Sequence, residues 1–211
     1  MGKFVMFDFK RYLTTLQQLD VLESLVMPQS VVLLSGSSHY AHASLSQEQQ
    51  QFLQVVQPAG YHIIPSNFPY NRQFDHQQTQ FPSLLQASVS NIAYYRHTLW
   101  NTAFQKELCR HLRPLFALEN IVLVTQSSGL NMFTQIMSQM PNNPTLKLIA
   151  LGPVATKEMV PAPNHWIIKG QKDYYSRILD CHTPTHIVAC GHHDYLVSPA
   201  VKEVLDDIIK N

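Results

Sequence analysis

Two adjacent serines, Ser127 and Ser128, lie in a short turn (TQSSG, 125–129) between an apolar run and residues that can start a helix. A tight strand-to-helix turn pushes a hydroxyl outward, and the free N–H groups at the start of the helix can stabilise a developing oxyanion. Small flanking residues are needed because neighbouring backbone segments approach closely. The turn therefore indicates a nucleophilic serine, and a serine that only caps a helix is the structural alternative.

The turn at 125–129 resembles the nucleophile elbow of the α/β-hydrolase superfamily, whose usual pattern is Gly-x-Ser-x-Gly. On that pattern Ser127 is the nucleophile, Ser128 supplies a backbone N–H, and Gly129 is the second small residue. Thr125 replaces the first glycine with a bulkier, β-branched residue. The resemblance implies a Ser-His-Asp triad, in which the acid and then the histidine follow the serine along the chain.

Two later turns are similar to those that carry the acid and the base in this superfamily. The base takes the proton of the serine, and the acid holds the tautomer of the base. Residues 169–173 (KGQKD) look like the Gly-x-x-Asp turn, which implies Asp173 as the acid. Residues 191–196 (GHHDYL) look like the Gly-His turn, which implies His192 as the base because it directly follows the glycine. His193 is the alternative base.

A small-residue loop (SGSSH, 35–39) follows the apolar run Val31–Leu34. In the superfamily, the loop after an early strand supplies the second N–H of the oxyanion hole. The resemblance therefore implies the backbone N–H groups of Ser37 and Ser128 as the oxyanion donors, with Ser38 as the fallback for Ser37. A serine opens this loop where the superfamily usually has a histidine.

The acid has alternatives. Asp173 is placed to cap a helix over the following YYSRIL segment, a common use of aspartate. Asp180 and Asp194 are the other candidates for the acid.

Two histidine-containing clusters, HYAH at 39–42 and HHD at 192–194, raise the question of a metal. Imidazole and carboxylate groups are common ligands of zinc and iron. Neither cluster places two ligands on one helical turn, as His-Glu-x-x-His does. We therefore expect no metal and no cofactor.

Short apolar runs of strand length recur along the chain. They are almost continuously apolar and do not alternate, which is typical of strands buried on both faces of a parallel sheet. The predicted strands are Val31–Leu34, Tyr61–Ile64, Ile121–Val124, Leu146–Leu151, Trp166–Ile168 and His186–Cys190.

Helical segments are predicted between these runs. Ser46 opens a capping box before QEQQQFLQVV, apolar spacing over 84–112 indicates one long helix or two consecutive ones, and Ser198 with Pro199 starts the last helix. The alternation predicts one α/β domain over 1–211, a three-layer α/β/α sandwich with a mainly parallel, α/β-hydrolase-like sheet.

Composition narrows the possible partners. The net charge is +1 and charged residues make up 14% of the chain, which gives no electrostatic footprint for nucleic acid. No stretch approaches the roughly 20 apolar residues of a membrane helix. The three cysteines match neither a zinc site nor a disulfide framework. Without a secretory leader pattern, a cytoplasmic location is expected.

The resemblance to the α/β-hydrolase superfamily implies a serine hydrolase that cleaves a small-molecule acyl ester or thioester through an acyl-enzyme. Amide cleavage or acyl transfer by the same triad is an alternative. A catalytically inactive binding or interaction protein with this fold is the alternative from another class, suggested by Thr125 and the loop at 35–39. The interval 147–163 is too short for an inserted cap, and the irregular segment 66–83 is expected to overhang the site.

Overall fold

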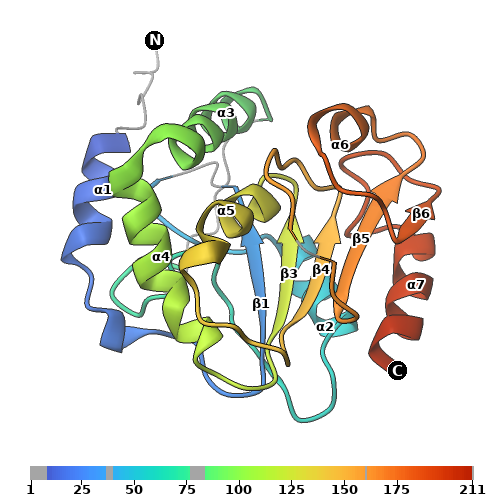
Figure 1. Cartoon of the computed structure of the whole chain (residues 1–211), viewed down its shortest axis with the longest axis horizontal. Coiled ribbons are helices and arrows are strands. Elements are labelled where there is room, and N and C mark those ends of the chain that lie inside the picture. Colours follow the sequence, from blue (N-terminus) through green and yellow to red (C-terminus); the bar gives the residue numbers. More distant parts are fainter. Residues whose placement is uncertain (1–8, 37–39, 77–83, 160, 211) are drawn as a thin grey trace.

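The computed structural model describes residues 9–36, 40–76, 84–159 and 161–210. Figure 1 shows a central sheet with helices on both faces, which makes a three-layer α/β/α sandwich. The described sheet is six-stranded and every neighbouring pair of strands is parallel, in the order β2-β1-β3-β4-β5-β6. The strands are β1 (Ser30–Ser35), β2 (His62–Ile63), β3 (Val122–Gln126), β4 (Lys147–Leu151), β5 (His165–Gly170) and β6 (His186–Val188). The predicted α/β class with a parallel sheet is confirmed.

All six predicted strands are found within two residues of their expected bounds. The two outermost strands, β2 and β6, are each two residues shorter than the apolar runs that predict them. Each of them has a neighbour on one side only, so pairing ends sooner there than in the middle of the sheet.

The helices also follow the predictions, with one addition. They are α1 (Phe9–Gln18), α2 (Gln47–Val55), α3 (Leu84–Trp100), α4 (Thr102–Phe116), α5 (Gly129–Ile136), α6 (Tyr174–Leu179) and α7 (Pro199–Lys210), with short 3₁₀ turns at Val21–Glu23 and Met137–Gln139. The capping box of α2 is confirmed, because the hydroxyl of Ser46 accepts from Gln49 N and the side chain of Gln49 accepts from Ser46 N. α1 is not among the predicted elements.

The segment 84–112 contains two consecutive helices, which settles the alternative that the periodicity leaves open. The chain leaves the helical region at Asn101, whose side-chain oxygen accepts a hydrogen bond of 3.1 Å from Phe104 N. An asparagine at this position satisfies a free N–H of the new helix. The side chain of Asn101 therefore starts α4 directly after α3.

Two hydrophobic clusters fill the spaces between the layers. Buried side chains of α1, α4 and α5 pack on one face of the sheet, and buried side chains of α2 and α7 pack on the other. Consecutive strand residues alternate between the clusters, as with Leu123 and Val124 of β3. Both faces of the central strands are therefore shielded from solvent, which accounts for their continuous apolar sequences.

The order of the strands fixes where a ligand can enter. β2 lies on one side of β1 and β3 lies on the other, so the direction of the chain crossovers reverses between β1 and β3. In open parallel sheets, ligands bind outside the carboxyl ends of the strands at such a switch point. The loops that begin at Gly36 after β1 and at Ser127 after β3 both leave the sheet at this place.

Part of the segment 66–83 holds the end of β1. The side-chain amide of Asn67 accepts from Ser35 N at 3.0 Å and donates to the Ser35 carbonyl oxygen at 3.1 Å. Ser35 pairs with Gln126 of β3 on one side, and Asn67 satisfies its backbone N–H and carbonyl groups on the side that the short β2 does not reach. Residues 77–83, where the expected overhang continues, lie outside the described residues.

Gly129 lets α5 lie against the end of β1. A Cβ atom at Gly129 would be 1.8 Å from the carbonyl oxygen of Leu34, which belongs to the backbone of a central strand. We expect Gly129→Ala to lower the free energy of unfolding by about 3 kcal/mol, because the helix must move away from the sheet. Urea unfolding followed by circular dichroism measures the change.

Gly60→Ala is the matched control for this prediction. Gly60 has a φ of +83° but open space around its missing side chain, with the nearest atom 4.0 Å away. The substitution costs only the positive φ, about 1 kcal/mol. Equal losses at the two glycines would contradict a close approach at Gly129.

Candidate active site

Ser127 occupies a sharp corner between β3 and α5. Its φ is +51°, which is uncommon for a residue with a side chain. Two backbone hydrogen bonds hold this conformation, because Ser127 N donates to the Leu151 carbonyl oxygen at 3.0 Å and Val154 N donates to the Ser127 carbonyl oxygen at 3.1 Å. Leu151 at the end of β4 and Val154 shortly after it thus hold the N–H and the carbonyl group of the strained residue.

The hydroxyl of Ser127 is turned toward the last part of the chain. Its Oγ lies 3.2 Å from Nε2 of His192, which is within hydrogen-bond reach. On the other side of the imidazole ring, Nδ1 of His192 lies 3.0 Å from each carboxylate oxygen of Asp173. The structure therefore brings Ser127, His192 and Asp173 together in one hydrogen-bonded series, although 65 residues separate the first two.

The contacts of His192 decide which ring nitrogen carries the proton. A carboxylate only accepts hydrogen bonds, so Nδ1 next to Asp173 is the donor. Nε2 is then the acceptor and can receive the proton of the Ser127 hydroxyl. This is the arrangement that a general base for Ser127 requires.

Asp173 caps α6 and contacts His192 at the same time. Its side chain is fully buried, and Oδ1 accepts a hydrogen bond of 3.0 Å from Ser176 N in the first turn of α6. The helix-capping alternative for Asp173 is therefore correct as a description of its position. It does not compete with the contact to His192, because the carboxylate has lone pairs for both.

The surroundings of Asp173 keep it ionised. Burial alone raises the pKa of this carboxyl, but hydrogen bonds from the His192 ring, Ser176 N and the Tyr195 hydroxyl outweigh burial and hold the pKa well below its usual range. The negative charge is thus stable beside the imidazole. A protonated His192 would be stabilised by it during a reaction.

The low pKa of Asp173 predicts a loss of stability in acid. An unfolded aspartate titrates near about 3.9, so at lower pH the unfolded chain binds a proton that the folded chain does not. The contribution of Asp173 is therefore complete above about pH 5 and declines as the pH falls. Between about pH 6 and about pH 3, we expect the free energy of unfolding to fall by about 1 kcal/mol more in the wild type than in Asp173→Asn.

Urea titrations at a series of pH values test this expectation. Asparagine is as good a helix cap as aspartate, so the substitution removes the charge and keeps the start of α6. The same decline in both proteins would contradict the low pKa of Asp173.

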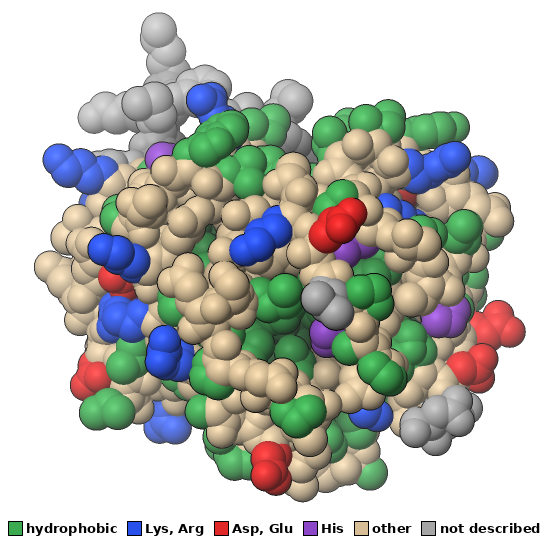
Figure 2. Space-filling view, viewed as in Figure 1, with side chains coloured by type: hydrophobic (Ala, Val, Ile, Leu, Met, Phe, Trp, Pro, Cys, Tyr) green, Lys and Arg blue, Asp and Glu red, His purple; other side chains and the backbone are tan. Residues whose placement is uncertain are grey.

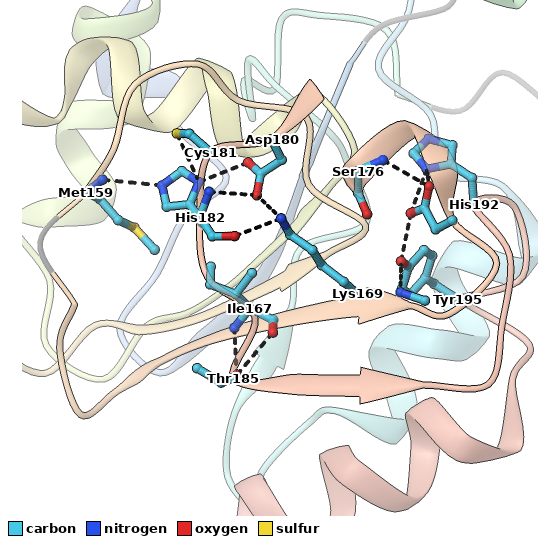
Figure 3. Close-up of polar contacts among 12 residues, drawn as sticks. Met159, Ile167, Lys169, Ser176, Asp180, Cys181, His182, Thr185, His192 and Tyr195 are labelled. Atoms are coloured by element: carbon cyan, nitrogen blue, oxygen red, sulfur yellow. Dashed lines mark hydrogen bonds and ion pairs between the residues drawn. The ribbon is translucent and has the colours of Figure 1, made fainter. Parts of the chain in front are cut away.

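The alternative acids and base make other contacts. Asp194 Oδ2 accepts from Gly191 N at 2.9 Å and closes the turn before the histidines. Asp180 lies in a separate buried network with Lys169 and His182 (Figure 3). His193 is exposed, and its ring centroid lies 5.4 Å from that of His192. Within the described part of the chain, the hydrogen bonds, ion pairs and ring contacts of these three residues include neither Ser127 nor Asp173.

The network around Asp180 contains potential metal ligands that are already engaged. Asp180, Cys181 and His182 offer atoms within 4.8 Å of one another. However, Lys169 Nζ lies 2.9 Å from the Asp180 carboxylate, and Met159 N donates to His182 Nε2. His182 Nδ1 must then carry the proton that faces Asp180 at 2.9 Å. A cation would compete with a buried ammonium group, so this cluster is a structural network. Neither His42 nor the cluster at 192–194 belongs to it, and His39 lies outside the described residues.

The oxyanion loop is described only at its start. Ser37 and Ser38 lie outside the described residues. A Cβ atom at Gly36 would be 2.4 Å from the hydroxyl oxygen of Ser128 and 3.2 Å from Oδ1 of Asn91, so the loop begins directly against the turn that holds Ser127. Ser128 is buried at the N-terminus of α5, where backbone N–H groups are free of helical partners.

Thr125, the departure from the glycine pattern, is accommodated inside the sheet. It is 1% exposed and pairs with Leu34 of β1 and Ala150 of β4. Ala150 is the small residue at this level of the sheet, and it leaves room for a β-branched neighbour. The threonine therefore leaves the turn that follows it intact.

Tyr195 and Gly152 belong to the site and were not predicted from the sequence. The Tyr195 hydroxyl donates to Asp173 Oδ2 at 2.7 Å, and a Cβ atom at Gly152 would lie 2.8 Å from the same oxygen. Tyr195 stands three residues after His192, but nothing in that spacing indicates which acid it reaches. Gly152 directly follows β4, and its positive φ of +49°, which only the structure reveals, is one reason for a glycine at this position.

Apolar side chains flank the edge of the sheet at which Ser127 lies. Figure 2 shows hydrophobic groups along this upper edge, over α3 and α6. Tyr174, Tyr175 and Ile178 of α6 are all more than half exposed, and so is Ile92 of α3. The ring of Tyr175 lies 5.3 Å from the ring of His192, so the apolar surface of α6 reaches the imidazole.

Comparison with known proteins leaves the function to be argued from this geometry. No protein-family model and no curated protein matches the chain. Among solved structures, the chain is similar to TT1662 from Thermus thermophilus at 14% identity, covering 89% of this chain and 92% of that one, with a TM-score of 0.42. So distant a likeness carries no argument about activity. Within the described residues, no helix is long and apolar enough to cross a membrane.

Proposed function

We propose that this protein is a serine hydrolase of the α/β-hydrolase type that cleaves an ester or thioester through an acyl-enzyme. Ser127 is the nucleophile, His192 the general base and acid, and Asp173 the group that orients His192. The observation that carries the proposal is the unbroken series of hydrogen bonds from the Ser127 hydroxyl through both nitrogens of His192 to the buried carboxylate of Asp173. Capping or packing alone does not require such a series.

In the proposed reaction, the Ser127 oxygen attacks the carbonyl carbon while its proton passes to His192 Nε2. Asp173 remains a carboxylate and stabilises the imidazolium. When the tetrahedral intermediate collapses, the bond to the leaving alcohol or thiol breaks and the leaving group takes the proton from His192. Water then repeats both steps, and releases the acid and the free Ser127 hydroxyl.

Backbone N–H groups would stabilise the charge on the carbonyl oxygen during these steps. Ser128 N at the start of α5 is one donor, and Ser37 N in the loop after β1 is the other. The position of Gly36 against Ser128 supports this assignment, because it brings the start of that loop to the turn. Donors of this kind contribute about a hundredfold or more to the rate.

The substrate class follows from the surroundings of the triad. The exposed apolar residues of α6, among which Tyr175 reaches His192, favour a substrate with an apolar group next to its carbonyl carbon or leaving group. We infer a small-molecule ester or thioester of that kind. No group other than the side chains and N–H groups named above is needed for the proposed chemistry.

A fluorophosphonate probe tests the proposal. We expect the folded protein to be labelled stoichiometrically, with one phosphonyl group on Ser127 identified by mass spectrometry, because the activated oxygen displaces fluoride from phosphorus. Ser127→Ala is expected to remove the label. A folded protein that takes up no label would contradict the hydrolase and favour the binding-protein alternative.

A further inference from the structure

A buried tyrosine hydroxyl contacts the proposed catalytic acid from the side opposite the helix cap. The side chain of Tyr195 is 1% exposed, and its hydroxyl lies 2.7 Å from Asp173 Oδ2. Figure 3 shows Tyr195, Ser176 and His192 near one another. Among the described residues, Tyr195 has no hydrogen bond to Ser127 or His192, so its direct link to the proposed triad is the hydrogen bond to Asp173.

The direction of this hydrogen bond is fixed by a second contact. Gly170 N, at the end of β5, donates to the Tyr195 hydroxyl oxygen at 2.6 Å. Because that N–H occupies a lone pair of the oxygen, the hydroxyl proton is free to point at the carboxylate, which can only accept. Tyr195 is therefore the donor to Asp173.

Each oxygen of the carboxylate is consequently held by more than one donor. Oδ1 accepts from Ser176 N and lies 3.0 Å from His192 Nδ1, while Oδ2 accepts from Tyr195 and lies at the same distance from Nδ1. Ser176 N restrains one end of the carboxylate, and the Tyr195 hydroxyl restrains the other. Without Tyr195, the plane of the carboxylate could rotate away from the imidazole.

The backbone at Gly152 lies directly behind Tyr195 and Asp173. A Cβ atom at Gly152 would be 2.4 Å from Cε2 of Tyr195 and 2.8 Å from Asp173 Oδ2. The tyrosine ring and the carboxylate therefore pack directly on the backbone that follows β4. Burial and the hydrogen bond to Asp173 both raise the pKa of Tyr195 far above its usual range, so the hydroxyl keeps its proton.

We propose that Tyr195 is a positioning residue that acts through Asp173, by holding the carboxylate plane toward His192 Nδ1. Its effect on catalysis rests on the proposed function, whereas its effect on the geometry of Asp173 and His192 does not. Tyr195→Phe removes the hydroxyl and keeps the ring that fills the core.

A double-mutant cycle tests the proposal through the rate of fluorophosphonate labelling. We expect Tyr195→Phe to slow labelling about tenfold, as for the loss of one hydrogen bond to a charged group. In the Asp173→Asn background the same change should slow labelling less than about twofold, because the carboxylate through which Tyr195 acts is gone. Equal slowing in both backgrounds would show a general structural role and overturn the proposal.

Tyr70→Phe is the matched control. Tyr70 is fully buried and its hydroxyl donates to the Leu33 carbonyl oxygen at 2.6 Å, so this substitution also removes one buried tyrosine hydrogen bond. Thermal unfolding should show a similar loss of stability in both variants, and labelling should slow only in Tyr195→Phe. If Tyr195→Phe melts below the assay temperature, the wild type, Tyr195→Phe and Tyr70→Phe are all labelled at a lower temperature at which each is folded.

A measurement without turnover separates this inference from the proposed function. The Nδ1–H proton of His192 should give a downfield proton NMR signal, assigned by its absence in His192→Gln, because it faces a carboxylate. We expect the signal to move or broaden in Tyr195→Phe and to stay in Tyr70→Phe. If the wild type takes no label, the proposed function fails and this signal alone decides: a change supports the positioning role, and an unchanged signal overturns it.

Discussion

Ser127→Ala is expected to lower the turnover of short p-nitrophenyl esters by about 10⁴- to 10⁶-fold, whereas Ser128→Ala should keep turnover within about tenfold of the wild type. The two serines are neighbours in the same turn, but only the hydroxyl of Ser127 lies against His192, at 3.2 Å from Nε2. Alanine at 128 keeps the backbone N–H that the proposed oxyanion hole uses. Release of p-nitrophenol, normalised to folded protein, measures both variants.

The comparison also decides which serine is the nucleophile. The residual rate of Ser127→Ala is a measure of what the N–H groups and substrate binding contribute without a nucleophile. If Ser128→Ala were the inactive variant and Ser127→Ala retained turnover, the nucleophile would be Ser128 and not Ser127. If both variants matched the wild type, the hydrolysis would not come from this turn.

Asp173→Asn is expected to lower turnover by about 10⁴-fold while the protein stays folded. An asparagine can present its amide nitrogen to His192, which favours the tautomer with the proton on Nε2 and leaves no acceptor for the Ser127 hydroxyl. The helix cap on Ser176 N survives, because asparagine also caps helices well. The kcat of ester hydrolysis should therefore fall with little change in KM.

Asp180→Asn is the contrasting variant. Asp180 has a buried side chain too, but its partners are Lys169 and His182 and not His192. Removing its charge leaves the ammonium of Lys169 buried without a counterion, which costs about 3 kcal/mol of stability. We expect Asp180→Asn to melt at a lower temperature and to keep its turnover per folded molecule. Equal losses of kcat in the two variants would contradict Asp173 as the acid.

The parts of the fold that depend on local pattern were predictable from the sequence. Continuous apolar runs predicted the strands, and Ser46 with Gln49 predicted the start of α2. The turns at 125–129, 169–173 and 191–196 were predicted to meet because carboxyl ends of parallel strands share one edge. The strands and the start of α2 need only the neighbours of a residue along the chain, whereas the choice of these three turns also rests on their resemblance to the turns of the α/β-hydrolase superfamily.

What the sequence does not reveal depends on contacts between distant segments. α1 is an exception: its apolar residues recur at helical spacing, and the prediction missed it all the same. These residues are Phe9, Tyr12, Leu13 and Leu16, and Tyr12 and Leu16 are buried against other helices. Tyr195 reaches Asp173 only because β5 and β6 pair as they do and Gly152 leaves space. The direction of the Tyr195 hydroxyl and the space left by the absent side chain of Gly152 arise only when these segments come together. Neither can be read from the spacing of residues along the chain.

The strands that precede the proposed nucleophile and the proposed base differ in how many neighbouring strands they pair with. Ser127 follows β3, which pairs with a strand on each side, whereas His192 follows β6, a three-residue strand at the outer edge. Edge segments with few backbone hydrogen bonds open at a lower free energy than the centre of a sheet. On heating, β6 and the turn that carries His192 should therefore unfold before the central strands do. The central strands should still protect their amide protons from exchange at that point. Activity should accordingly be lost at a lower temperature than the one at which the whole protein melts.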